Sequence, residues 1–333
     1  MSDPALVEIR DVSRRFIKHL DLAGKIAQRF GADVREETVH AVDQVSFSID
    51  QGEVVGLVGE SGCGKSTIGR MVAGILEPSE GTILYRGKQL TDMSPDEARH
   101  ASLKVQMIFQ DPFASLNPRM RVADIIGEAP RVHGVVQPAE FDGYVEEVLQ
   151  NCGMDPSFKL RYPHQFSGGQ RQRIGIARAL AVKPDFIVCD ESVAALDVSI
   201  QAQILNLFMD LRERFDLTYL FISHDLGVVE HLSDRVVIMY LGRVVESAPT
   251  ETVFTQPVHP YTQALLREVP RLESRHADFQ PITGEIPSPI DPPSGCHFHP
   301  RCPHAMERCR TEQPALREIA AGHLSACHLN ESH

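Results

Sequence analysis

The spacing of apolar and polar positions along the chain predicts strands and helices in alternation. Residues 7–12 and 45–49 alternate apolar with polar side chains, which is typical of strands with one buried face. Residues 53–58 are almost continuously apolar and predict a strand that is buried on both faces. The same reasoning predicts further strands at residues 82–85, 105–109, 186–189, 218–222 and 235–240. The first pair indicates an antiparallel flap, and the later strands indicate an α/β fold with a central sheet.

Helical patterns fill the intervals between these strands. A helix is expected at residues 95–103, because a serine and a proline stand at its start. From about residue 114 to 166 the pattern is helical throughout, with candidates at 122–129 and 141–152 that prolines terminate. A short amphipathic helix is also expected at residues 22–30. We therefore expect an all-helical subdomain inserted between the two halves of the sheet.

Composition and charge limit the class of protein. The 333 residues are 42% hydrophobic and 23% charged, which is ordinary for a globular protein and excludes a disordered one. The net charge is −12 and the isoelectric point is near 5.7, so a protein whose main task is to grip a nucleic-acid backbone is disfavoured. No apolar run approaches the roughly eighteen residues that a membrane-spanning helix needs, and the N-terminus lacks a basic-then-apolar leader. These features favour a cytoplasmic protein.

The stretch GESGCGKST at residues 59–67 follows the buried strand, leads into a helical pattern and satisfies the phosphate-loop motif GxxxxGK[ST]. Its glycines let consecutive backbone N–H groups face phosphate oxygens beside the positive end of the helix. We expect Lys65 to reach the β and γ phosphates, Ser66 to bind Mg²⁺ through its hydroxyl and Thr67 to close the loop. The other nucleotide-binding residues expected here are Gly59, Ser61, Gly62, Cys63 and Gly64. The alternative is a plain glycine-rich turn at a helix start.

Polar residues stand where three later strands end. Asp190 and Glu191 follow residues 186–189, and a buried strand does not explain two carboxylates beside a phosphate loop. We expect Asp190 to lie in the Mg²⁺ shell and Glu191 to act as general base or to orient the attacking water. Gln110 and His224 also follow strands, so they face the same crevice, although such residues are more often loop or structural residues.

The stretch SGGQ at residues 167–170 opens another helical pattern. Ser167 can be a plain N-cap. Alternatively, Ser167, Gly168, Gly169 and Gln170 form a second anion site, since the serine, the glycine N–H groups and the helix dipole all favour an anion. Such a site has no use for a phosphate that the first loop already holds. It is meaningful only if the phosphate belongs to another subunit.

Four of the seven cysteines crowd the end of the chain, after a Pro-, Gly- and Ser-rich connector at residues 281–293. Four thiolates are a full complement for a tetrahedral zinc ion or for a four-iron cluster, and four unligated buried thiols are the alternative. The histidines among them are expected to be solvated or structural. The candidate metal ligands are Cys296, Cys302, Cys309 and Cys327.

The order of the motifs over about residues 7–256 resembles the nucleotide-binding subunit of an ABC transporter, a P-loop NTPase. In chain order the motifs are Phe16, the phosphate loop, Gln110, residues 167–170, residues 186–191, Asp197 and His224. Three further segments are similar to the oligopeptide/dipeptide import branch, and the spacer before residue 45 is most like its F-type subunit. These segments are residues 111–118 (DPFASLNP), 161–166 (RYPHQF) and 259–265 (HPYTQAL).

The resemblance implies roles for these residues. Phe16, which by itself is more typical of a core aromatic, matches the ring that stacks on adenine. Gln110 matches a glutamine that touches Mg²⁺ and water, and His224 matches a histidine that contacts the γ-phosphate. Ser167 and Gly169, with the rest of SGGQ, match the signature that caps the γ-phosphate bound by the opposite subunit. Asp197 matches a loop at the dimer interface. Ser192 and Ala194 depart from the usual Pro and Ser or Thr, which puts the rate in doubt more than the activity.

The resemblance also implies a function. It divides the chain into an ABC ATPase domain at residues 1–256, with its helical subdomain at about 114–166, and a C-terminal extension at residues 257–333. ATP hydrolysis by a closing dimer would power peptide import at the cytoplasmic face of the inner membrane. The implied partners are two membrane-spanning permease subunits, a second ATPase subunit in a heterodimer and, indirectly, a solute-binding protein. The implied cofactors are ATP, Mg²⁺ and a [4Fe-4S] cluster, the last in preference to Zn²⁺.

A second function class remains open from the sequence. A soluble ABC-type ATPase that acts on nucleic acid would share the ATP-binding motifs, and its cysteine-rich tail would then bind zinc. The acidic charge, the single ATPase half and the peptide-branch segments favour the importer and predict no nucleic-acid partner.

Overall fold

The structure, a computed structural model, describes residues 5–18, 36–89, 92–111, 113–194, 196–268, 282 and 284–331. The helix predicted at residues 22–30 lies outside the described residues.

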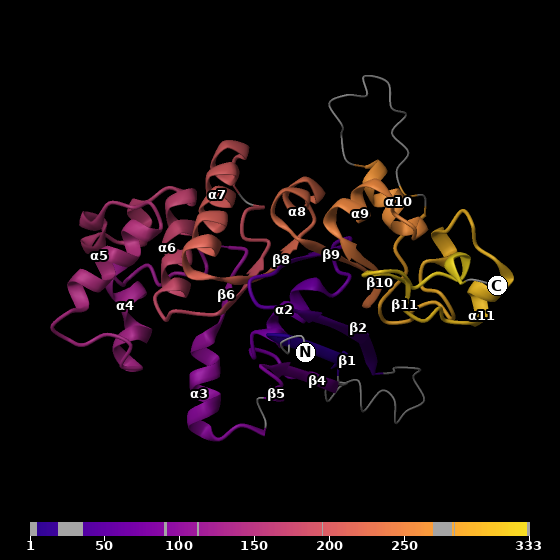
Figure 1. The fold of residues 1–333 in the computed structure, drawn as a ribbon, viewed down its shortest axis with the longest axis horizontal. Helices are drawn as coiled ribbons and strands as arrows, with labels where there is room; N and C mark the ends of the chain where they lie inside the picture. The colour runs from indigo at the N-terminus through magenta and orange to yellow at the C-terminus, as the bar shows by residue number, and fades with distance from the viewer. Residues whose placement is uncertain are drawn as a thin grey trace, which may run out of the picture.

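A four-stranded antiparallel sheet forms the predicted flap (Figure 1). Both of its N-terminal strands are longer than the alternating pattern predicted, because residues beyond that pattern continue the ladder. Phe16, for example, is paired with Val39. The sheet has the order β2-β1-β4-β5, with β1 (Val7–Lys18), β2 (Glu37–Ile49), β4 (Glu80–Tyr85) and β5 (Lys88–Gln89).

The central sheet has eight strands in the order β11-β12-β10-β9-β3-β8-β7-β6. The pairs β9–β3, β3–β8, β8–β7 and β7–β6 are parallel, so these strands end at one edge of the sheet. That edge is where an α/β sheet binds ligands. The strands are β3 (Val54–Val58), β6 (Val105–Ile108), β7 (Phe186–Asp190), β8 (Thr218–Ser223), β9 (Arg235–Tyr240), β10 (Arg243–Pro249), β11 (Arg317–Ala320) and β12 (His323–Ser325).

Helices cover the sheet, and the helical insertion gathers at one end of the molecule (Figure 1). The helix predicted to end at residue 129 continues through Pro130 to Val132, because a proline removes only one N–H donor and this helix ends within a turn of it. The helices are α2 (Lys65–Val72), α3 (Pro95–Lys104), α4 (Val122–Val132), α5 (Phe141–Asn151), α6 (Gly168–Leu180), α7 (Val198–Phe215), α8 (Leu226–Leu232), α9 (Thr250–Thr255), α10 (Pro260–Arg267) and α11 (Glu307–Thr311). Short 3₁₀ turns lie at Pro156–Leu160, Pro163–Gln165, His299–Arg301 and His328–Asn330.

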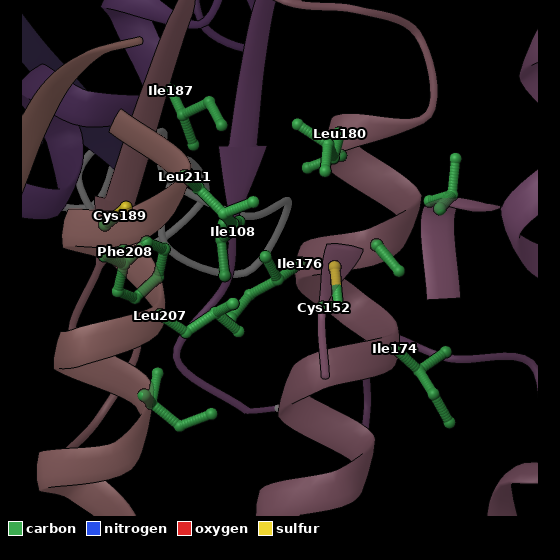
Figure 2. Packing of buried hydrophobic residues seen from close by; sticks show 14 of the residues in the cluster. Ile108, Cys152, Ile174, Ile176, Leu180, Ile187, Cys189, Leu207, Phe208 and Leu211 are labelled. Carbon is green, nitrogen blue, oxygen red and sulfur yellow. The ribbon is translucent and has the colours of Figure 1, made fainter. Parts of the chain in front are cut away.

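One apolar core joins the sheet to the helical insertion (Figure 2). Ile108 of β6 and Ile187 of β7 pack with side chains of α6 and α7. Cys152 and Cys189 are fully buried in this core, and burial raises the pKa of the Cys152 thiol to about 12. These two cysteines are therefore structural. Among the helices of the described residues, we find none with the length and apolar character needed to cross a bilayer.

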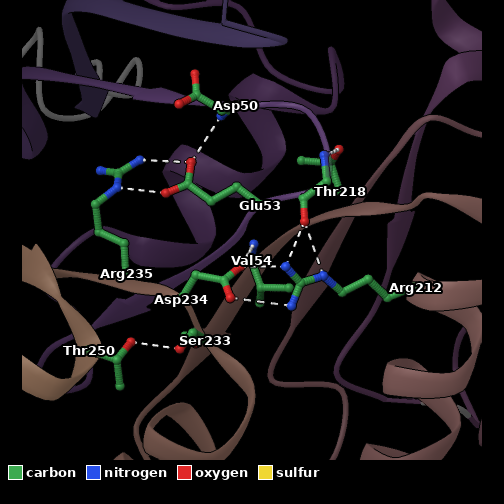
Figure 3. Close-up of polar contacts among 10 residues, drawn as sticks. Asp50, Glu53, Val54, Arg212, Thr218, Ser233, Asp234, Arg235 and Thr250 are labelled. Atoms are coloured by element: carbon green, nitrogen blue, oxygen red, sulfur yellow. Dashed lines mark hydrogen bonds and ion pairs between the residues drawn. The ribbon is translucent and has the colours of Figure 1, made fainter.

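Ion pairs anchor the start of β3, at the end of the strand that lies away from the phosphate loop (Figure 3). The Glu53 carboxylate accepts from Arg235 Nε at 2.7 Å, and Arg212 Nη2 donates to Asp234 at 2.6 Å. The same Asp234 carboxylate accepts from the N–H of Val54 at 2.8 Å. These contacts hold the first residue of β3 in place. The phosphate loop directly follows the last residue of β3, so they also help to position this loop.

The C-terminal extension joins the central sheet directly. Strand β12 pairs with β10, so the extension supplies the last two strands of the sheet. Glu246 of β10 is fully buried, and its carboxylate lies 2.8 Å from Nε2 of His323 on β12. The carboxylate also accepts from the backbone N–H groups of Val258 and His259 at 3.0 Å. With three partners, the hydrogen-bonding needs of this buried carboxylate are met. Its contacts connect β10 to residues 258–259 and to β12.

Candidate functional site

A cavity of about 260 Å³ opens where β3, β6 and β7 end. The phosphate loop forms one wall, and Gln110 and Glu191 form part of another. The structure thus brings together residues that lie far apart in the sequence but were predicted to share one site. The predicted residues that line the cavity are Ser61, Gly62, Gly64, Lys65, Ser66, Thr67, Gln110 and Glu191. Sequence reasoning missed three lining residues, Val39, Ala41 and Pro289.

The phosphate loop has a conformation that requires glycine. Gly64 has a φ of +104°, and a Cβ atom there would lie 2.2 Å from the carbonyl oxygen of Ala41. The loop then leads directly into α2, whose first turn presents free N–H groups. Lys65 is buried, and its ammonium donates to the carbonyl oxygens of Gly59 at 2.7 Å and Glu60 at 3.0 Å. This donor-rich wall fits the phosphates of a nucleotide.

Cys63 lies behind the loop rather than in the cavity. Its side chain is buried, and its Sγ atom lies 3.8 Å from the Lys65 ammonium nitrogen. Burial raises the pKa of the Cys63 thiol, so the side chain is a neutral packing group. Any contact of Cys63 with a nucleotide would be made by its backbone.

Oxygen ligands suitable for Mg²⁺ converge beside the loop. The Ser66 hydroxyl donates to Oδ1 of Asp190 at 2.7 Å. Burial raises the pKa of Asp190, although the hydrogen bond from Ser66 opposes this shift. A hydroxyl and a carboxylate at this separation fit the preference of Mg²⁺ for hard oxygen ligands.

Glu191 is held in an unusual backbone conformation at the end of β7. Its φ of +47° lies in the left-handed region, which costs a residue other than glycine about 1–3 kcal/mol. Oε2 of Glu191 accepts from Nε2 of Gln110 at 2.6 Å, and Oε1 lies 3.4 Å from Nδ1 of His224. Gln110 and His224, both predicted because they follow strands, therefore contact the carboxylate of Glu191, the third such residue, beside the cavity. Such local strain clusters at functional sites.

The remaining predicted residues lie outside this cavity. Ser167 and Gln170 form a capping box, in which Ser167 Oγ accepts from the Gln170 N–H at 3.4 Å. Asp197 is the exposed N-cap of α7. Phe16 is 40% exposed on β1, and the Arg14 guanidinium lies 4.8 Å from the centre of its ring. Its strand partner Val39 lines the cavity, so Phe16 lies near the rim.

The flap, the sheet, the phosphate loop and the strand-end carboxylates together define an ABC-type P-loop ATPase. Comparisons with known proteins agree. The profile of the ABC transporter family matches residues 42–194, and that of the oligopeptide/dipeptide transporter C-terminal region matches residues 245–309. The chain belongs to the ATP-binding proteins of the ABC transporter family, in the oligopeptide/dipeptide branch, and it is an ATPase.

Individual relatives support this assignment. The oligopeptide transport ATP-binding protein AppF of Bacillus subtilis is 49% identical over 328 residues, which cover 97% of each chain. The structure of CbiO1 from Clostridium perfringens, part of an ABC transporter complex, is similar with a TM-score of 0.61 and 26% identity over 76% of this chain and 91% of CbiO1. The dimeric ATP-binding cassette MJ0796 bound to ADP and phosphate gives a TM-score of 0.61 at 26% identity, covering 73% of this chain and 98% of that one.

The predicted [4Fe-4S] cluster is wrong. All four candidate cysteines are described, and the described part of the chain holds no group of three or more Cys, His, Asp or Glu side chains arranged to bind a metal ion. The cavity between the cysteines has only about 10 Å³ of free space. The name of the relative AppF, oligopeptide transport ATP-binding protein, mentions no iron–sulfur cluster. The same findings give no support to the zinc alternative at Cys296, Cys302, Cys309 and Cys327.

Proposed function

We propose that this ATPase powers the import of oligopeptides or dipeptides as a peripheral subunit on the cytoplasmic face of the cell membrane. The observation that carries the proposal is the combination of a cavity lined by the phosphate loop, Gln110 and Glu191 with a C-terminal region of the oligopeptide/dipeptide type. The similarity to an oligopeptide transport ATP-binding protein over nearly the whole chain supports it. The acidic charge gives no support to the nucleic-acid alternative.

The geometry of the cavity suggests how hydrolysis proceeds. Backbone N–H groups of the phosphate loop and Lys65 bind the phosphates, and Ser66 and Asp190 would hold Mg²⁺, which stabilises the negative charge of the phosphates. Glu191 accepts the proton of the attacking water. Gln110 and His224 position the Glu191 carboxylate through the contacts described above.

The exposed N-terminus of α6 supports a dimeric mechanism. Ser167, Gly168, Gly169 and Gln170 lie outside the cavity of their own chain, so a γ-phosphate that they bind must belong to a second ATPase chain. The dimeric form of the related cassette supports this arrangement. In our proposal Asp197 lies at the same dimer interface, and Phe16 stacks on the adenine base. The second chain is a distinct ATPase subunit of the same transporter.

An exposed aromatic side chain supports docking to the membrane-spanning partners. Phe113 is 59% exposed between the sheet and the helical subdomain, and the Arg171 guanidinium lies 4.0 Å from the centre of its ring. We propose that two permease subunits contact the region of residues 113–126. A solute-binding protein would act through them and not through this chain.

The transport role is tested by co-purification from membranes. A tagged chain expressed with its neighbouring subunits is expected to retain integral-membrane partners in mild detergent, and peptide supply is expected to raise ATP turnover of the reconstituted complex. A chain that purifies without membrane partners but binds DNA in a salt-sensitive manner contradicts the proposal.

The cross-subunit site gives a prediction with a matched control. Ser167→Ala is expected to lower ATP turnover roughly 10–100-fold, because a hydrogen bond to a charged phosphate is lost from the closed dimer. ATP binding to the separate chain should be unchanged. Ser94→Ala removes the equivalent cap from α3, which also has a capping box, and should leave turnover as in the native protein. Equal turnover in both variants, measured by phosphate release, would contradict the dimeric mechanism.

A further inference from the structure

The C-terminal extension contacts the phosphate loop through an ion pair between a buried arginine and a partly buried glutamate. The side chain of Arg301 is only 4% exposed, and its guanidinium donates to both oxygens of the Glu60 carboxylate, at 2.7 and 3.0 Å. Glu60 is the second residue of the phosphate loop. The guanidinium also lies 5.8 Å from the centre of the Tyr240 ring. Because both hydrogen bonds of a bidentate arginine must form together, they fix the orientation of the Glu60 carboxylate, and the positive charge of the arginine compensates the negative charge of the carboxylate.

A second residue of the extension holds the backbone at the same position. The Tyr261 hydroxyl oxygen accepts from the N–H of Glu60 at 2.9 Å. Tyr261 is fully buried, and its ring packs against Tyr240 and Phe298 with centres 4.7 and 5.3 Å apart. Glu60 is therefore fixed at its side chain and at its backbone, in both cases by residues beyond position 256.

Glu60 in turn contacts the lysine that faces the phosphates. The carbonyl oxygen of Glu60 accepts from the Lys65 ammonium at 3.0 Å. A continuous series of contacts thus connects Arg301 to Glu60 and Glu60 to Lys65. A shift of the Glu60 peptide would move one of the two carbonyl groups that orient the ammonium.

The extension also reaches the cavity on its flap side. Pro289 lines the cavity, and its carbonyl oxygen accepts from the N–H of His40 on β2 at 2.9 Å. The next lining residue of β2, Ala41, lies against Gly64 of the phosphate loop. The extension therefore supports the site from two directions.

The positive charge of Arg301 compensates the negative charge of Glu60. Glu60 places a carboxylate inside a loop that binds a polyanion, and an unpaired negative charge there would repel the phosphates. Arg301 neutralises this charge while the hydrogen bonds hold the loop in place.

We propose that the C-terminal extension is a working part of the ATP site, in which Arg301 positions Lys65 through Glu60 and cancels the Glu60 charge. Arg301 is a positioning residue, since it does not line the cavity. The inference rests on the proposed role of Lys65 in binding phosphates.

The test compares ATP affinity and turnover in full-length variants. Arg301→Gln is expected to raise the apparent Kd and KM for ATP roughly tenfold, which is within the usual range for coupling between two sites, while kcat at saturating ATP changes less. Arg301→Lys is expected to restore part of the affinity. Arg308→Gln, which removes an exposed arginine of the same extension that pairs with Glu312 and Glu331, is the matched control and should bind ATP normally.

A double variant separates positioning and charge from plain loss of stability. Glu60→Gln combined with Arg301→Gln is expected to bind ATP more tightly than Arg301→Gln alone, because the uncompensated carboxylate is gone. Native affinity in Arg301→Gln, or a double variant no tighter than the single one, would overturn the proposal. If Arg301→Gln fails to fold, Arg301→Lys and the double variant provide the same comparison. A chain that keeps full ATP affinity without Lys65 would instead reject the phosphate role on which the inference rests.

Discussion

Replacing Glu191 by Gln is expected to reduce ATP turnover by roughly 10²–10⁴-fold, the usual contribution of a general base. The amide has nearly the shape of the carboxylate and can still contact Gln110 and His224, which meet at this side chain. It cannot accept a proton from water. ATP binding should persist, because the phosphate loop and Lys65 are unchanged, and the closed dimer should therefore accumulate.

The Glu191 prediction is measured by phosphate release and by size-exclusion chromatography with and without ATP. Glu213→Gln is the control, since Glu213 is an exposed carboxylate on α7. Turnover in that variant should equal that of the native protein. If Glu191→Gln hydrolyses ATP at the native rate, Glu191 is not the general base.

Replacing Lys65 by Met is expected to weaken ATP binding at least 100-fold. The ammonium is buried in the cavity wall, and charge-assisted hydrogen bonds to phosphate are about twice as strong as neutral ones. The substitution also leaves the carbonyl groups of Gly59 and Glu60 without this donor. Both effects act in the same direction, so affinity should fall more than for any loop residue that contributes only a backbone N–H.

Titration with a fluorescent ATP analogue measures the Lys65 effect. Lys88→Met is the matched control, because the exposed Lys88 on β5 pairs with Glu97 far from the phosphate loop. A Lys65→Met protein that binds the analogue as tightly as the Lys88 variant would show that Lys65 does not hold the phosphates.

Local patterns were sufficient to predict most of the fold. A short, continuously apolar run such as residues 186–189 is typical of a buried central strand, and β7 forms where it was expected. The pattern did not predict β12, because its three residues are too short to show a period. It ended α4 too early, because a proline is a strong sequence signal but a small cost near a helix end.

The candidate site was predictable where residues follow strands in the sequence. Asp190 is the last residue of β7, His224 directly follows β8, and Gln110 lies two residues after β6, so the topology alone brings them to one edge. Pro289 could not be predicted in this way. It lies in an irregular segment, and its contact with His40 spans most of the chain.

The cysteine prediction failed for a physical reason. Four thiols at suitable spacing suggest a metal site only if the fold arranges them as ligands around a space for the metal. The described residues hold no group of three or more Cys, His, Asp or Glu side chains arranged in that way, and the space between the four cysteines is about 10 Å³. Spacing along the sequence does not contain this arrangement.

The ion pair between Glu60 and Arg301 has a consequence for biosynthesis. The two residues are 241 positions apart, so on the ribosome the loop emerges long before its partner. At typical elongation rates of about 5–20 residues per second, the delay is on the order of tens of seconds. During this interval the nascent chain carries an unneutralised carboxylate and an uncovered β10 edge. Under the proposed role of Arg301, the ATP site is expected to reach its full affinity only after translation has passed Arg301, and a fragment released earlier would bind ATP more weakly.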